Sequence, residues 1–116
     1  MNDNDLAKYI WHILNLDPYI PMSWGIDLDS ISVEKQGLSF DVYGFKHTGK
    51  VKVTYNEGSD LFQFELISPD GNLSSIQTGI YVDELTRLID EAVEKTKNYE
   101  DMVMSEIVGS HKTTVL

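Results

Sequence analysis

The spacing of apolar residues changes twice along this chain, and the two changes constrain its fold more than any other feature. From residue 26 to about residue 80, apolar and polar side chains alternate, most clearly over 38–45 and 61–67. Such alternation is typical of strands with one buried face. On either side of this region, apolar residues recur every three or four positions, which is typical of helices with one buried face. The sequence therefore predicts a helix, a group of strands and a second helix.

Turn-forming residues divide the alternating region into short strands. Glycine occurs in each of the four intervening segments, and the segment 68–72, with its proline and glycine, is the strongest turn signal among them. Because connections this short join antiparallel neighbours, we expect a meander of four to five strands. The expected strands cover 27–34, 38–45, 50–55, 61–67 and, as a weaker pattern, 73–78.

The two helices are expected over 4–16 and 81–97. The first has Asp3 or Asp5 available to cap its start. Pro18 ends it, because the residue before a proline is disfavoured in the helical conformation. We expect both helices to cover one face of the antiparallel sheet, which is an α+β architecture.

The length of 116 residues suits a single domain. We expect this α+β domain to cover residues 1–108. Residues 109–116 are expected to form a flexible tail, because Gly109 ends the helical pattern. The connector 17–25, between the first helix and the strands, contains two prolines. It is expected to pack in an extended form without regular structure.

No residue pattern in this chain is typical of a catalytic or metal-binding site. The sequence has no cysteine, which excludes disulfides, thiolate catalysis and cysteine-ligated metal sites. His12, His47 and His111 lack the short spacings of metal motifs, and no glycine-rich phosphate loop or serine-nucleophile motif occurs. We interpret Asp27 and Asp29 as solvated residues at a strand start rather than as metal ligands. The sequence therefore predicts no catalytic residue, no cofactor and no metal site, and it gives the enzyme hypothesis no support.

Acidic residues outnumber basic ones by 19 to 9, and the formal net charge is −10. This charge disfavours direct binding to nucleic acid or to an anionic membrane surface, because both are negative. No apolar run is long enough for a membrane span, and the acidic start differs from a signal peptide, so we expect a cytoplasmic location. We interpret the charge mainly as a source of solubility, and a basic protein partner is the sharper hypothesis.

Aromatic and methionine side chains gather in and near the connector 17–25. Trp and Tyr are common at the energetic centres of interfaces, and Met adapts to varied surfaces. The alternative interpretation is that this segment closes one end of the sheet. Aromatic residues of the strand 38–45 are expected on the sheet face opposite the helices, where they would form a binding or dimer surface. The candidate partner-binding residues are Tyr19, Met22, Trp24, Tyr43, Phe45, Asp90, Glu91 and Glu94.

Three functions fit these observations. The first is a small acidic non-enzymatic protein-binding module, such as an inhibitor, an immunity protein, an adaptor or a chaperone-like domain. The second is an acidic mimic of nucleic acid that blocks a DNA-binding protein, and it depends on the acidic residues within 83–101. The third is a small ligand-binding domain or enzyme with a pocket between helices and sheet. A homodimer through the uncovered sheet face is compatible with the first function.

Overall fold

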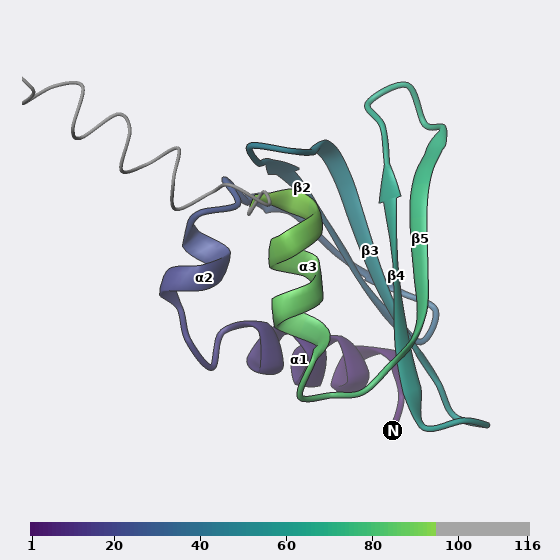
Figure 1. Ribbon diagram of the computed structural model, residues 1–116. Helices are drawn as coiled ribbons and strands as arrows, with labels where there is room; N and C mark the ends of the chain where they lie inside the picture. Colours follow the sequence, from purple (N-terminus) through teal and green to yellow (C-terminus); the bar gives the residue numbers. More distant parts are fainter. Residues whose placement is uncertain (95–116) are drawn as a thin grey trace, which may run out of the picture.

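The computed structural model describes residues 1–94, which form one sheet with helices packed against it (Figure 1). The order of elements confirms the predicted α+β architecture. β1 and β4 have the predicted bounds, and the other strands differ from prediction by one or two residues at an end. The elements are α1 (Asp3–Leu14), α2 (Tyr19–Met22), β1 (Asp27–Glu34), β2 (Gly37–Tyr43), β3 (Thr48–Asn56), β4 (Leu61–Ile67), β5 (Leu73–Ile80) and α3 (Leu85–Val93).

The strands pair in the order in which they occur along the chain, β1-β2-β3-β4-β5, and each pair is antiparallel. The register places Leu38 opposite Val53 and Val53 opposite Phe64, so the apolar members of the alternating pattern share one face. α1 and α3 lie on that face, and no helix of the described residues covers the other face (Figure 1). The predicted meander, with both helices on one side, is confirmed.

The core lies between the helices and the apolar face of the sheet. Phe40 of β2 is fully buried there, and two tryptophan rings pack against it. The Trp24 ring stacks on Phe40 at a centroid distance of 6.2 Å, and the Trp11 ring meets it edge-on at 6.1 Å. Ile10 of α1 and Ile89 of α3 are also fully buried. Each large apolar side chain buried in this way stabilises the fold by about 1.5–3 kcal/mol.

The start of α1 differs in one detail from the prediction. Asn2, and neither Asp3 nor Asp5, caps the helix: its side chain accepts a hydrogen bond from the Asp5 backbone N–H at 2.8 Å. The prediction was wrong because Asn and Asp cap helices equally well, so the residue type does not identify the first turn. The Asp3 carboxylate instead accepts from the Gln36 backbone N–H at 2.9 Å, and this bond joins α1 to the β1–β2 turn.

The connector 17–25 is not extended, contrary to the prediction. It contains the single helical turn α2, and Pro21 of this turn is buried. Both prolines fit because proline has a backbone φ angle close to the helical value. The N–H that Pro21 lacks is one of the first-turn groups that have no partner within a helix. A proline therefore argues against the interior of a long helix but not against one turn.

The last described helix begins later than predicted. Residues 81–84 form a turn in which the Glu84 N–H donates to the Tyr81 carbonyl at 3.0 Å, and α3 follows. At its other end, the Lys46 and His47 backbone N–H groups donate to the Val93 carbonyl at 2.8 and 3.2 Å. These bonds tie the end of α3 to the β2–β3 connection. The predicted helix end at residue 97, the domain end at residue 108 and the tail 109–116 lie outside the described residues.

Candidate functional site

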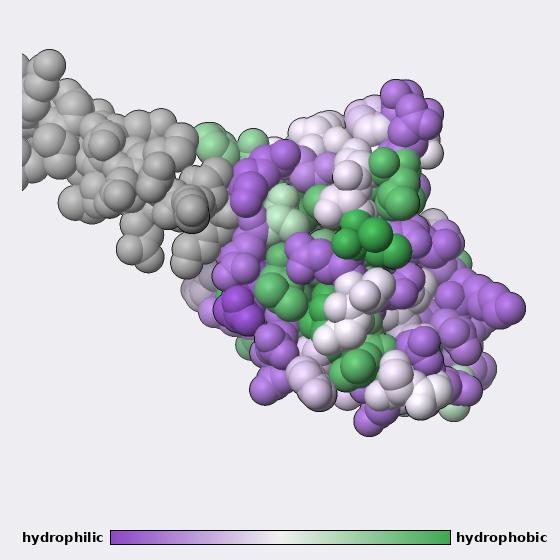
Figure 2. Space-filling view, turned by 45° about the vertical axis from the view of Figure 1, so that its right-hand side comes forward, coloured by the Kyte–Doolittle hydropathy of each residue, from purple (hydrophilic) through white to green (hydrophobic). Residues whose placement is uncertain are grey.

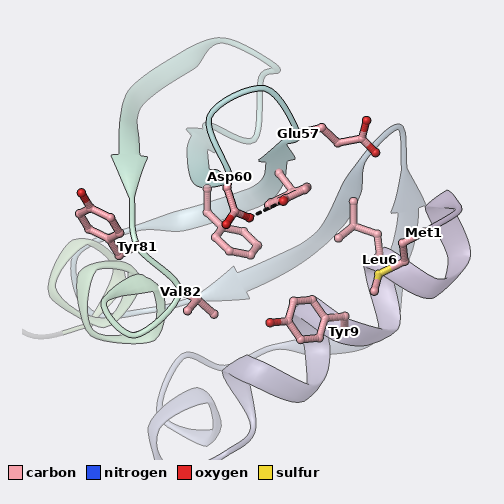
Figure 3. A pocket seen from close by; sticks show the side chains of 9 residues that line it. Met1, Leu6, Tyr9, Glu57, Asp60, Tyr81 and Val82 are labelled. Atoms are coloured by element: carbon pink, nitrogen blue, oxygen red, sulfur yellow. Dashed lines mark hydrogen bonds between the residues drawn. The ribbon is translucent and has the colours of Figure 1, made fainter.

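A pocket of about 630 Å³ lies at the end of the molecule where α1 begins (Figure 3). Four parts of the chain build it: the start of α1, the end of β3, the β3–β4 turn with the start of β4, and the connection from β5 to α3. The meander brings these parts together although they are distant in sequence. The lining residues are Met1, Leu6, Tyr9, Tyr55, Glu57, Asp60, Phe62, Tyr81 and Val82.

The pocket combines aromatic rings with carboxylates. Tyr9 and Tyr81 keep 41% and 61% of their surface exposed, so their rings are accessible from solvent. In Figure 3, Tyr9 and Val82 lie on one side of the space and Asp60 on the other. None of the described lining residues is a lysine or an arginine. The pocket therefore presents tyrosine rings and two carboxylates, and its lining contains no lysine or arginine side chain.

A hydrogen bond fixes the position of one of the carboxylates. The Tyr55 hydroxyl donates to Asp60 Oδ1, and the Tyr55 ring packs on Phe62 at a centroid distance of 5.1 Å. Because a phenolate beside a carboxylate is disfavoured, the bond to Asp60 is the largest cause that raises the pKa of Tyr55. Asp60 has a φ of +59°, a left-handed conformation that Asp and Asn tolerate better than most residues. Its N–H donates to the Asn56 carbonyl at 2.8 Å, which closes the β3–β4 turn.

This arrangement is suited to a cation. A lysine or arginine side chain, or a small organic cation, is attracted by the face of a tyrosine ring and by a nearby carboxylate. Within residues 1–94, no group of three or more His, Asp and Glu side chains is arranged to hold a metal ion. Neither His12 nor His47 lines the pocket. The His47 ring is buried elsewhere, with Nε2 at 3.2 Å from the Lys50 carbonyl oxygen.

The aromatic candidates from the sequence lie at the other end of the molecule, around α2. Tyr19 and Met22 of α2 are largely exposed, and so are Tyr43 at the end of β2 and Phe45 just after it. The Tyr43 backbone N–H donates to the Trp24 carbonyl at 3.0 Å, which joins the connector to β2. Four of the predicted partner-binding residues are thus accessible at one end of the molecule, and no described contact assigns them a ligand.

Trp24 is the exception among these candidates. Its side chain is fully buried, stacked on Phe40, and its Nε1–H donates to Asp90 Oδ1 at 2.9 Å. The alternative interpretation, that the connector closes one end of the sheet, describes Trp24 correctly. The helical turn of α2 directs the chain back toward the core, and so the tryptophan that follows it enters the core. Trp24 cannot contact a partner while the protein remains folded in this way.

The three acidic candidates on and after α3 all have partners inside the molecule. Asp90 accepts from the Trp24 indole, and Glu94 Oε2 accepts from the Phe45 backbone N–H at 2.7 Å. Glu91 pairs with Arg87 at 3.0 Å, one helical turn away. The Asp90 and Glu94 carboxylates hold α3 against the connector and the β2–β3 connection, whereas the Glu91–Arg87 pair lies within the helix. The contacts reduce what the three acids can offer to a partner.

Comparison of the chain with family models, with curated proteins and with solved structures gave no significant match. The geometry of the described residues is therefore the basis for any functional assignment. Among residues 1–94, no helix is long and apolar enough to cross a membrane.

Proposed function

We propose that this protein is a small acidic, non-enzymatic protein-binding module, and that its pocket receives a lysine or arginine side chain of a basic partner. The observation that carries the proposal is the pocket itself, whose lining includes Tyr9, Tyr55, Tyr81, Glu57 and Asp60 and no lysine or arginine side chain. Such a module would be an inhibitor, an immunity protein, an adaptor or a chaperone-like domain.

The overall charge supports a basic partner. With a net charge of −10, the chain attracts basic proteins over a distance and repels acidic ones. This attraction acts mainly on the rate of association and weakens as salt screens it. The pocket adds a short-range contact in which an aromatic face and a carboxylate meet one cation. Steering by the whole molecule and recognition in the pocket thus favour the same class of partner.

The two other functions have less support. A mimic of nucleic acid needs an array of acids that are free to face a DNA-binding protein, and Asp90, Glu91 and Glu94 instead have partners within the fold. Enzyme chemistry in this pocket would have to use its carboxylates and tyrosines, because no histidine, serine or lysine lines it. A small organic cation as ligand is a second candidate that the pocket does favour, because a free amine or guanidine has the same chemistry as the side chain.

The experiment is a titration of the labelled protein with two matched peptides, followed by NMR chemical shifts. One peptide has a single arginine among neutral residues, and the other has the neutral isostere citrulline at that position. We expect the arginine peptide alone to shift signals of the pocket residues, with Tyr9 and Tyr55 among them. Titration with free N-acetyl-arginine amide distinguishes the two kinds of ligand. If the pocket binds a small organic cation, this compound binds as tightly as the arginine peptide. If the pocket binds a side chain of a protein partner, the compound binds more weakly than the peptide.

Two double variants make the test specific for the pocket. Glu57→Gln with Asp60→Asn removes both pocket carboxylates while it keeps their shape, and asparagine tolerates the left-handed backbone of residue 60. Asp27→Asn with Asp29→Asn removes the same charge from the start of β1, at the opposite end of this strand from the β1–β2 turn that bonds to Tyr55. We expect the first pair to abolish binding of the arginine peptide and the second to preserve it. Equal binding by both double variants would contradict the proposal.

A further inference from the structure

The strand β5 forms one edge of the sheet. It pairs with β4 along one side, and no strand of the described residues pairs with its other side. The outward backbone N–H and C=O groups of such a strand are available for pairing with another strand. Its central part is regular, with Glu65 opposite Ile76 and Leu66 opposite Ser75, and the irregularities of the β4–β5 ladder lie toward its ends.

β5 lacks three of the features that usually protect an edge strand, although its ladder with β4 shifts register twice and Gly79 has a φ of +68°. Proteins commonly protect such edges with charged side chains, with prolines or with a covering helix. The strand Leu73–Ile80 contains no charged residue and no proline. Leu73 and Ile76 are 57% and 48% exposed on the face opposite the helices. Figure 2, which brings the right-hand side of Figure 1 forward, shows weakly polar and apolar residues in a band between hydrophilic areas.

The opposite edge of the sheet, β1, is protected. It carries the acidic residues Asp27, Asp29 and Glu34, and its pairing with β2 shifts register between Asp27 and Ser32. Acidic side chains on an edge strand disfavour the addition of a strand from another acidic protein. The β5 strand of one molecule therefore has no suitable partner in the β1 strand of another.

We propose that β5 pairs in antiparallel fashion with β5 of a second copy of this chain, so that two sheets become one continuous sheet. β5 is a neutral segment in a chain of net charge −10, and it can meet its own copy without placing like charges opposite each other. A two-fold axis perpendicular to the sheet would place Leu73 and Ile76 of both copies on the same outer face. Their apolar side chains would then cover one another across the new pair.

The helices leave room for this pairing. α1 packs against β1 and β2, at the far side of the sheet from β5. In Figure 1 neither α1 nor α3 crosses β5. Because the two-fold axis places the helices of both copies on one face, each helical layer stays over its own half of the joined sheet. The proposal goes beyond the proposed function, since it uses a different surface of the protein.

Salt distinguishes this dimer from the binding of a basic partner. Two copies that each carry a charge of −10 repel one another, and added salt screens this repulsion. The dimer should therefore form more readily as salt rises, whereas binding of a basic partner should weaken. The two proposals predict opposite responses to the same change.

The experiment is sedimentation velocity of the full chain over a wide range of protein concentration, at low and at high salt. Two matched variants each place a glutamate on an exposed edge position: Ser75→Glu on β5 and Ser32→Glu on β1. Both variants change the net charge equally. We expect the wild type and Ser32→Glu to dimerise with rising concentration. Ser75→Glu should raise the dissociation constant severalfold, because it places two like charges on adjoining strands.

Hydrogen exchange locates the interface. We expect backbone amides of β5 to exchange more slowly at high protein concentration than at low concentration, and those of β1 to be unaffected. Circular dichroism checks that both variants are folded. A wild type that stays monomeric at every concentration would overturn the proposal, and so would equal dimerisation of the two variants. Binding of the arginine peptide by Ser75→Glu tests the pocket separately, so failure of one proposal does not decide the other.

Discussion

The two ends of this molecule contain similar residues, but their side chains have different partners. At the α2 end, Trp24 bonds to Asp90 and the Phe45 backbone bonds to Glu94. At the pocket end, Tyr55 bonds to Asp60, but among the described residues the side chains of Tyr9 and Glu57 make no hydrogen bond or ion pair. Composition alone therefore does not identify a binding surface. Internal contacts decide which aromatic and acidic groups are available to a partner.

A substitution in the buried part of the α2 end should reduce the stability of the protein most. Trp24→Ala should lower the free energy of unfolding by about 3–5 kcal/mol, because it leaves a cavity beside Phe40 and removes a stacked ring. Tyr19→Ala, on the exposed side of α2, should change it by less than about 0.5 kcal/mol. Urea unfolding measures both. A similar small effect for the two variants would show that Trp24 is not packed as described.

The acidic residues of α3 should differ in how much they contribute to stability. Asp90→Ala should lower the free energy of unfolding by about 1–3 kcal/mol, because the buried Trp24 indole N–H then has no acceptor. Glu91→Ala removes only an exposed ion pair with Arg87 and should cost at most about 1 kcal/mol. Asp90→Asn keeps an acceptor oxygen and should recover much of the stability. Equal losses for Asp90→Ala and Glu91→Ala in urea unfolding would argue against this distinction.

At the pocket end, we expect a change in binding with little change in stability. Tyr9→Ala should weaken binding of the arginine peptide about fivefold to tenfold, since a cation–π contact contributes about 1 kcal/mol at an accessible site. Tyr9→Phe keeps the ring and should bind nearly as well as the wild type. The NMR titration gives both affinities. If Tyr9→Phe weakens binding of the peptide as much as Tyr9→Ala does, the Tyr9 hydroxyl and not its ring contacts the arginine.

The smallest effect concerns the Tyr55–Asp60 hydrogen bond, which raises the pKa of Tyr55. The bond stabilises the folded state at neutral pH, and this contribution is lost as pH rises through the raised folded-state pKa. Asp60→Asn should lower the pKa of Tyr55 toward its ordinary value, because the carboxylate is gone. Tyrosine absorbance during a pH titration measures this, and Tyr55→Phe assigns the signal. An unchanged pKa in Asp60→Asn would mean that the bond does not form in solution.

The sequence predicted the fold well because periodicity reports burial directly. Alternation in 61–67 leaves one face apolar in any arrangement, and short turns permit few topologies besides a meander. Charge spacing within one helix is equally local: Arg87 and Glu91, four residues apart, form an ion pair. These features depend on neighbours in sequence or on one repeating pattern.

The sequence could not predict the site, because the site depends on contacts between distant segments. Tyr9, Tyr55 and Tyr81 come from separate parts of the chain, and only the register of the meander and the path into α3 bring them to one pocket. The burial of Trp24 depends on the helical turn α2. The sequence did not predict this turn, because the prolines of the connector indicated an extended segment. The one available signal was Tyr9, a large aromatic residue outside the apolar stripe of its helix.

The unequal edges of the sheet have a consequence for how far assembly can proceed. A sheet with two open edges can add molecules at both sides and has no natural limit to its growth. Here β1 carries acidic side chains, and only β5 is without charge. Under the β5 pairing that we propose, each molecule has one edge for a second copy, and pairing occupies that edge. We therefore expect assembly to stop at two copies.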